Sequence, residues 1–192
     1  MSSTRDTLIR ALHDVGAAAW FGGSLMGAVA VNGAANDLKD PTERAKLAAA
    51  GWARWAPVSA AAIAAHLIGG AGLILIHRDR VRDQAGVTAN TVTKTGLTGL
   101  ALASTAYSGV LGARIAAADK TPSAGGTKPT AATSDEVSTA QQQLRALQWV
   151  TPALTGALIA LGSQQGEQQR PAERIRGRAR KLVQTSRDSI NA

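Results

Sequence analysis

Long stretches without a charged residue alternate with short polar segments along this chain of 192 residues. Four stretches contain no Asp, Glu, Lys or Arg: Val15–Asn36, Trp55–Ile76, Thr95–Ala113 and Ala146–Gly166. A helix that rises about 1.5 Å per residue needs about 20 residues to cross the hydrocarbon layer of a membrane, and each stretch is near this length. A water-soluble amphipathic helix would carry charged residues along its wet face at regular intervals. The pattern therefore predicts four transmembrane helices.

The composition supports this fold class and excludes functional sites that need cysteine. Apolar residues make up 45% of the chain, but aromatic residues only 3%, so each span is moderately hydrophobic and rich in small residues. The absence of cysteine excludes a disulfide framework, a thiolate metal site and a cysteine nucleophile. We expect an all-α integral membrane protein, a four-helix bundle over residues 1–166, followed by a basic cytoplasmic tail over 167–192.

The positive charges predict the orientation of the four spans. Both termini and the middle loop share one side, which carries thirteen Lys and Arg residues against eight on the other side. Because positive residues accumulate on the cytoplasmic side, we expect both termini in the cytoplasm and the protein in the cytoplasmic (inner) membrane. Trp52, Trp55 and Trp149 then lie at the outer interface, where amphipathic indoles settle.

The first span also has features of a secretory signal peptide. Arg5 and Arg10 precede the apolar run, and Ala28-Val29-Ala30 resembles a cleavage site. The run is longer than the apolar region of a usual signal peptide, which favours a span that is retained.

The polar segments between the spans carry local signals. Asp40 as N-cap, Pro41 at the first position and Glu43 three residues on predict a short helix along the outer surface before the second span. Residues 119–138 are rich in Thr, Ser, Pro and Gly, which is typical of a flexible outer loop. Helical propensity returns at Asp135, so we expect the fourth helix to begin well outside the membrane.

Polar residues near the middle of the predicted transmembrane spans are the candidates for a functional site. His66 lies near the middle of the second span, and counting from the interfaces places Met26 of the first span at a similar depth. An ionisable residue inside a membrane is a functional-site hypothesis, and this pair suits copper(I) or haem iron. His13 and His77, at the cytoplasmic ends of adjacent spans, form a second candidate pair. The structural alternative is a neutral His66 held by one hydrogen bond to Tyr107 or a threonine.

The segment His13–Gly23, with the sequence HDVGAAAWFGG, resembles the first-helix signature of the copper resistance D-like family and related bacterial polytopic membrane proteins. In that signature a histidine opens the helix and an aromatic–Gly–Gly step follows a run of small residues. The resemblance implies a role in copper passage or in the assembly of membrane enzymes, with His13 as the candidate ligand. This chain has fewer spans than the fuller members and lacks a methionine-rich outer loop, which argues against copper transport.

Arginine and lysine are concentrated in the C-terminal tail. Basic residues just cytoplasmic of a span are attracted to anionic lipid headgroups by about 1 kcal/mol each. We therefore expect the tail to bind the inner leaflet through Arg174, Arg176, Arg178, Arg180 and Lys181. Docking onto an acidic cytoplasmic partner is the alternative, whereas the lack of interleaved aromatic residues argues against nucleic-acid binding.

Enzyme signatures are missing from the sequence. It contains no G-x-S-x-G, H-E-x-x-H, phosphate loop or dinucleotide fingerprint, so we expect no catalysis. The favoured function is that of an accessory or scaffold subunit, which packs its small-residue helix faces against other membrane proteins or a second copy. A metal- or haem-handling protein is the first alternative, and a small channel or transporter formed by an oligomer is the second.

Overall fold

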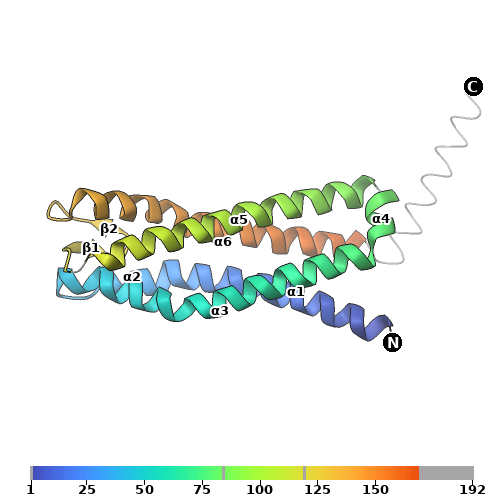
Figure 1. Ribbon diagram of the computed structural model, residues 1–192, viewed down its shortest axis with the longest axis horizontal. Helices are drawn as coiled ribbons and strands as arrows, with labels where there is room; N and C mark the ends of the chain where they lie inside the picture. Colours follow the sequence, from blue (N-terminus) through green and yellow to red (C-terminus); the bar gives the residue numbers. More distant parts are fainter. Residues whose placement is uncertain (1, 84, 119, 169–192) are drawn as a thin grey trace, which may run out of the picture. The chain divides into compact units, whose positions relative to one another are not determined.

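The computed structural model describes residues 2–83, 85–118 and 120–168 (Figure 1). The described chain forms two compact units, with the boundary after Leu158. The second unit contributes the C-terminal part of the last helix, to Gln168. The first unit holds all other elements, which are, in chain order, α1 (Ser2–Met26), the π-helix η1 (Gly27–Val31), α2 (Asn32–Asn36), α3 (Pro41–Ile76), α4 (Arg78–Asp83), α5 (Ala85–Ala117), β1 (Ser123–Gly125), β2 (Lys128–Pro129) and the start of α6 (Asp135–Gln168).

Four segments are long and apolar enough to cross a membrane. They cover Thr4–Asn36, Pro41–Ile76, Gly86–Ala117 and Asp135–Gln164. These segments confirm the four expected spans and the helix-bundle class. Each is longer than its charge-free stretch, and α6 begins at Asp135 as its local propensity predicts.

The start of α3 confirms one local prediction and corrects another. The Asp40 carboxylate accepts hydrogen bonds from the Thr42 backbone N–H at 2.8 Å and from its hydroxyl at 2.7 Å, so Asp40 is the N-cap. The expectation of a separate short helix was wrong, because α3 continues unbroken from Pro41 to Ile76. The residues between this cap and Trp55 include many alanines, which favour the helical state more than any other residue.

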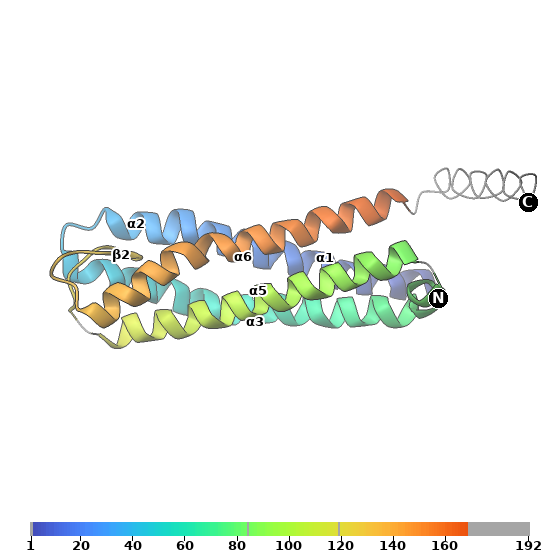
Figure 2. The same cartoon turned by 90° about the horizontal axis from the view of Figure 1, so that it is seen from above.

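Glycines bring α1 and α3 into close contact. Figure 1 and Figure 2 both show the two helices side by side. A Cβ atom at Gly16 would collide with the backbone of Ala62 and His66, and one at Gly69 would collide with the backbone of His13. Dispersion between closely packed backbones stabilises such a pair inside a membrane, where no hydrophobic force drives helices together.

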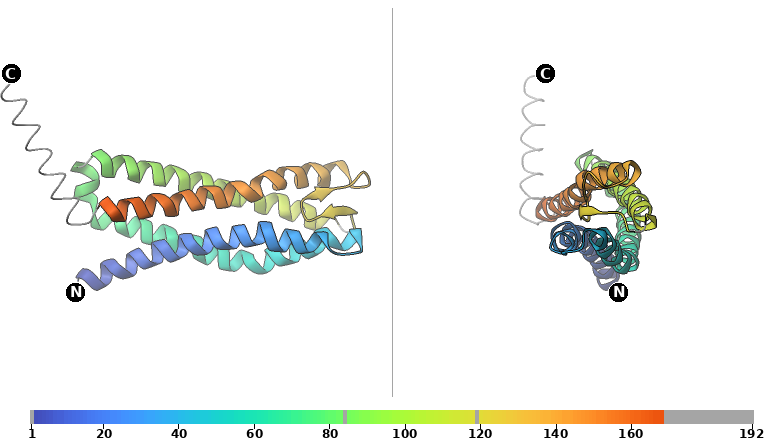
Figure 3. Two further views of the ribbon diagram at one scale, coloured as in Figure 1. Left: turned by 180° about the vertical axis from the view of Figure 1, so that it is seen from behind. Right: turned by 90° about the vertical axis from the view of Figure 1, so that its left-hand side faces the viewer.

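The segment expected to be a flexible loop instead contains a β-hairpin. Strands β1 and β2 pair antiparallel, with Ser123 opposite Pro129 and Gly125 opposite Lys128. Strand β1 lies against α2 and α3, and the hairpin is at one end of the helices (Figure 3). The Gln141 side chain on α6 is buried and donates to the Ser123 hydroxyl and the Gly125 carbonyl, both at 3.1 Å. The expectation of a loop was wrong for residues 123–129, whereas the mostly helical class is confirmed. Hydrogen bonds from a glutamine that is distant in sequence hold the hairpin.

A small hydrophobic core lies near this hairpin. It joins α3, α5 and α6 through Ala45, Leu111, Ile115, Val137 and Ala140. The core holds these helices together at the hairpin end of the first unit, and the candidate site lies beside it.

Candidate functional site

The two histidines of the close α1–α3 contact lie against each other. The ring centroids of His13 and His66 are 4.3 Å apart, with their planes tilted by 35°. His66 is buried, and its Nδ1 donates to the His13 carbonyl oxygen at 3.1 Å because a carbonyl oxygen can only accept. Its Nε2 lies 3.4 Å from the Thr98 hydroxyl, and His13 Nδ1 lies 2.8 Å from an Asp14 carboxylate oxygen.

These bonds have the pattern of a structural histidine with a threonine partner. Tyr107, the other predicted partner of His66, donates instead to Gln143 at 2.7 Å. A haem held by two histidines needs a macrocycle between the rings, whereas the His13 and His66 rings pack directly on each other. Within the described ranges, no three His, Cys, Asp or Glu side chains form a group that could hold a metal ion. Copper or haem binding stays a prediction.

The structure does not bring His66 and Met26 together. Met26 ends α1 with its side chain 45% exposed, and the next residue, Gly27, packs on Trp52. Trp52 precedes His66 by fourteen residues on α3, which corresponds to about 21 Å of helix. Met26 and His66 therefore lie at different levels along the α1–α3 pair, because the residue of α1 that packs on the His66 backbone is Gly16.

The remaining predicted site residues are also separate from this pair. His77 is the C-cap of α3, and its Nδ1 lies 3.0 Å from the Leu73 carbonyl oxygen. It follows Gly69, the residue packed on His13, by eight positions, or about 12 Å along a helix. The predicted lipid-binding residues lie outside the described residues: Arg174, Arg176, Arg178, Arg180 and Lys181.

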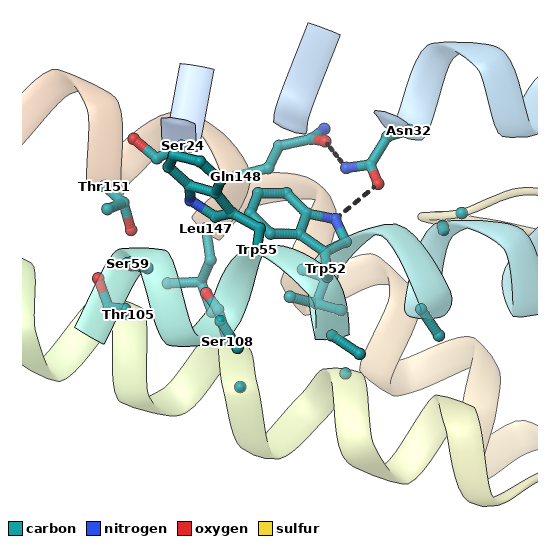
Figure 4. A pocket seen from close by; sticks show the side chains of 18 of the residues that line it. Ser24, Asn32, Trp52, Trp55, Ser59, Thr105, Ser108, Leu147, Gln148 and Thr151 are labelled. Carbon is teal, nitrogen blue, oxygen red and sulfur yellow. Dashed lines mark hydrogen bonds between the residues drawn. The ribbon is translucent and has the colours of Figure 1, made fainter. Parts of the chain in front are cut away.

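A cavity of about 490 Å³ lies between α1, α3, α5 and α6 beside the hairpin (Figure 4). Its volume is in the range of small-molecule sites, which is about 300–1,000 Å³. Three of the four tryptophans line it, Trp20, Trp52 and Trp55, together with alanine, glycine, aliphatic and hydroxyl side chains. No Asp, Glu, Lys, Arg or His is among the described residues that line this cavity. The cavity therefore suits an uncharged ligand, since a buried charge without a partner is costly.

Glycines on the first helix position the tryptophan walls. A Cβ atom at Gly23 would overlap the indole of Trp55, and one at Gly27 would overlap the indole of Trp52. Trp52 and Trp55 were expected among the outer interfacial aromatics, but their rings pack inward on α1 and η1, whereas Trp149 is 50% exposed. Without side chains at the two glycines, the indoles fit beside the first helix.

Asn32 closes one end of the cavity. Its side-chain oxygen accepts from the Trp52 indole N–H at 3.0 Å, and its nitrogen donates to the Gln148 side chain at 2.9 Å (Figure 4). Asn32 follows η1, and the wider turn of a π-helix changes which residues face inward; such turns are frequent at functional sites. Asn32 and Ala35, which both follow this turn, are buried.

Sequence reasoning missed Asn32 and Gln148. The search for charged residues passed over both amides because they are neutral. The available signal was the occurrence of side-chain amides within two stretches otherwise suited to a membrane.

The cavity reaches the surface between α3 and α5. Every lining residue that is also exposed belongs to one of these two helices, and all are alanine or glycine: Ala53, Ala56, Ala60, Gly109, Ala113 and Ala116. We call this set the side opening. Small residues leave room for a thin molecule to pass between the helices.

No protein-family model, curated protein or solved structure matches this chain. The resemblance of His13–Gly23 to the copper resistance D-like family therefore stays a prediction.

Proposed function

We propose that this protein is a multi-pass membrane protein that binds a neutral, lipid-like molecule between its helices and performs no catalysis itself. The observation that carries the proposal is an uncharged cavity with a side opening between two membrane helices. In a bilayer, a gap between α3 and α5 faces hydrocarbon, so the ligand would come from the lipid phase. An apolar cavity with few polar groups is the usual form of a small-molecule site.

The proposed topology places this cavity in the outer half of the membrane. The excess of Lys and Arg near the termini and the middle loop supports a cytoplasmic location for both termini, in the inner membrane. The hairpin is then on the outer side, and the cavity lies next to it.

An accessory role in a larger membrane assembly is a second proposal. It is supported by the outward surface of α5, where a Cβ atom at Gly96 or Gly99 would have no neighbour within 4 Å and where Leu100 is exposed. Small residues allow a helix of a partner protein to approach closely. Since the chain has no cysteine, a single engineered Gly99→Cys tests the contact in native membranes. A crosslinked product of one defined mass supports the role, and an uncrosslinked chain contradicts it.

Fluorescence quenching tests the ligand-binding proposal. The unmodified protein is compared with Trp149→Phe, which keeps all three tryptophans of the cavity, Trp20, Trp52 and Trp55. Each is titrated in detergent with a monoacylglycerol that carries bromine on its chain, which quenches indoles on contact. The difference in fluorescence between the two proteins belongs to Trp149, which is half exposed and serves as the positive control.

The proposal predicts that Trp149→Phe is quenched as well, including the part of its fluorescence that comes from Trp20. Trp20 is only 1% exposed and lines the cavity, so its quenching requires the probe to enter. If the fluorescence of Trp149 is quenched and that of Trp149→Phe is not, the proposed function is wrong.

A further inference from the structure

Several polar groups of the cavity have unused hydrogen-bonding capacity. Within the part of the chain that the structure describes, the Trp55 indole N–H and the hydroxyls of Ser59, Ser108 and Thr127 form no side-chain hydrogen bond, although all four residues line the cavity. Thr127 is 7% exposed as a whole residue, but none of the four polar atoms is among the buried, unpartnered ones of the described residues, which belong to Asp6, Asn90 and Gln141. The four groups are therefore accessible, and a ligand in the cavity they line can take the hydrogen bonds that they leave unused.

The unused polar groups of the cavity favour a ligand that accepts hydrogen bonds. An indole N–H can only donate, and a hydroxyl can donate one hydrogen. Asn32 uses one N–H for Gln148 and keeps a second. A ligand with carbonyl oxygens would match these donors, whereas a carboxylate or phosphate would enter a cavity without a cationic partner.

The tryptophan walls of the cavity favour a ligand with a flat head group. The indoles of Trp52 and Trp55 lie next to each other along one wall of the cavity (Figure 4). Aromatic rings pack well in offset or edge-to-face contact with other rings, which adds about 0.5–1.5 kcal/mol to the burial of their area. A planar ring would therefore gain more from this wall than a branched or saturated head.

The side opening suits an extended tail. It is framed by alanine and glycine on α3 and α5, so a hydrocarbon chain can leave the cavity there and lie in the bilayer. The unused donors belong to α3, α5 and the hairpin. Acceptors on different edges of one ring could reach donors on different elements.

We infer that the ligand is a prenylated quinone, a neutral planar ring with carbonyl acceptors and an isoprenoid tail, held among Trp55, Thr127 and Asn32. This inference rests on the proposed function and adds the ligand class. The ring occupies the tryptophan-walled cavity, and the tail passes through the side opening.

The test compares two ligands that differ only in their carbonyl oxygens. The full chain in mild detergent is titrated with a short-chain prenylated naphthoquinone, and separately with the naphthalene that carries the same tail. Native mass spectrometry measures the fraction of protein with one bound molecule. We expect the quinone to bind at least about fivefold more tightly, the effect of one net hydrogen bond.

Two conservative variants test which side chains bind the carbonyl oxygens of the quinone. Trp55→Phe keeps a ring and removes the N–H, and Thr127→Val keeps the shape and removes the hydroxyl. Each should lower quinone affinity by about fivefold and leave the affinity for the naphthalene unchanged. Two independent variants keep the test valid if one of them folds poorly.

The outcomes separate this inference from the proposed function. Equal affinities for quinone and naphthalene in the unmodified chain would overturn the ligand class and leave lipid binding intact. An unchanged quinone affinity in both variants would overturn the named recognition groups. If neither compound binds, the ligand class and the proposed function both fail.

Discussion

The indole N–H of Trp52 donates to the side-chain oxygen of Asn32 at 3.0 Å, which ties α3 to the residue that follows the π-helix. Through its amide nitrogen, Asn32 also bonds to Gln148 of α6 at 2.9 Å. One buried side chain thus connects three segments that are distant in sequence, at the end of the cavity next to the hairpin. In a low-dielectric interior such a network is strong when satisfied and costly when broken.

Replacing Asn32 by leucine should destabilise the first unit. The Trp52 N–H and the Gln148 amide each lose a buried partner, at a cost of about 1–3 kcal/mol per group. Thermal unfolding followed by near-ultraviolet circular dichroism in detergent measures the loss. Ala34→Leu, at an exposed position of α2, is the control and should leave the midpoint almost unchanged; equal midpoints for both variants would show that the network is unimportant.

Alanine substitutions at two adjacent glycines, Gly22 and Gly23, should have opposite effects on stability. A Cβ atom at Gly23 would overlap the Trp55 indole, whereas one at Gly22 meets no atom within 4 Å. Gly23→Ala should cost about 1–3 kcal/mol through overpacking, and Gly22→Ala should stabilise the helix by up to about 1 kcal/mol. The same unfolding measurement applies, and a stabilised Gly23→Ala would contradict the inward packing of Trp55.

The hairpin should depend on one of two neighbouring glutamines. Gln141 is buried and donates to Ser123 and Gly125, whereas Gln142 is exposed and donates to Ser138 on its own helix. Gln141→Leu should therefore raise amide hydrogen exchange across residues 123–129, and Gln142→Leu should not. Similar exchange in both variants would mean that the hairpin is held by other contacts.

Asp40 should give α3 an acid-sensitive start. Hydrogen bonds from the Thr42 hydroxyl and backbone N–H hold the pKa of the Asp40 carboxyl below its ordinary value of 3.8. Because the folded state lowers this pKa, the stabilisation is fully present above pH 3.8 and is lost as the pH falls through the lower folded value. Asp40→Asn keeps a capping oxygen that does not titrate, so its unfolding midpoint should fall less in this acid range. Parallel pH dependence of the two proteins would contradict this prediction.

The spans and the Asp40 cap could be predicted because they depend on residues close in sequence. The position of Met26 relative to His66 could not be predicted, because the register of α1 on α3 is set by close contacts such as that of Gly16 with His66. Asn32 is buried directly after a π-helix that local composition does not indicate, and the hairpin is bonded to Gln141 of another helix. Contacts of this kind are set by tertiary packing, which local composition does not encode.

The occupancy of the cavity shows directly whether this protein binds a neutral, lipid-like molecule. Native mass spectrometry of the protein, extracted gently from its own membrane, measures how many neutral lipid molecules stay bound to one chain. Ala60→Phe fills the side opening, and Ala64→Phe adds the same ring one turn further along α3, at an exposed position outside the cavity. We expect one bound neutral lipid in the unmodified protein and in Ala64→Phe, and at least about tenfold weaker retention in Ala60→Phe, equivalent to about 1.4 kcal/mol. Equal occupancy in the two phenylalanine variants, or an empty unmodified protein, would contradict the binding of a neutral lipid in this cavity.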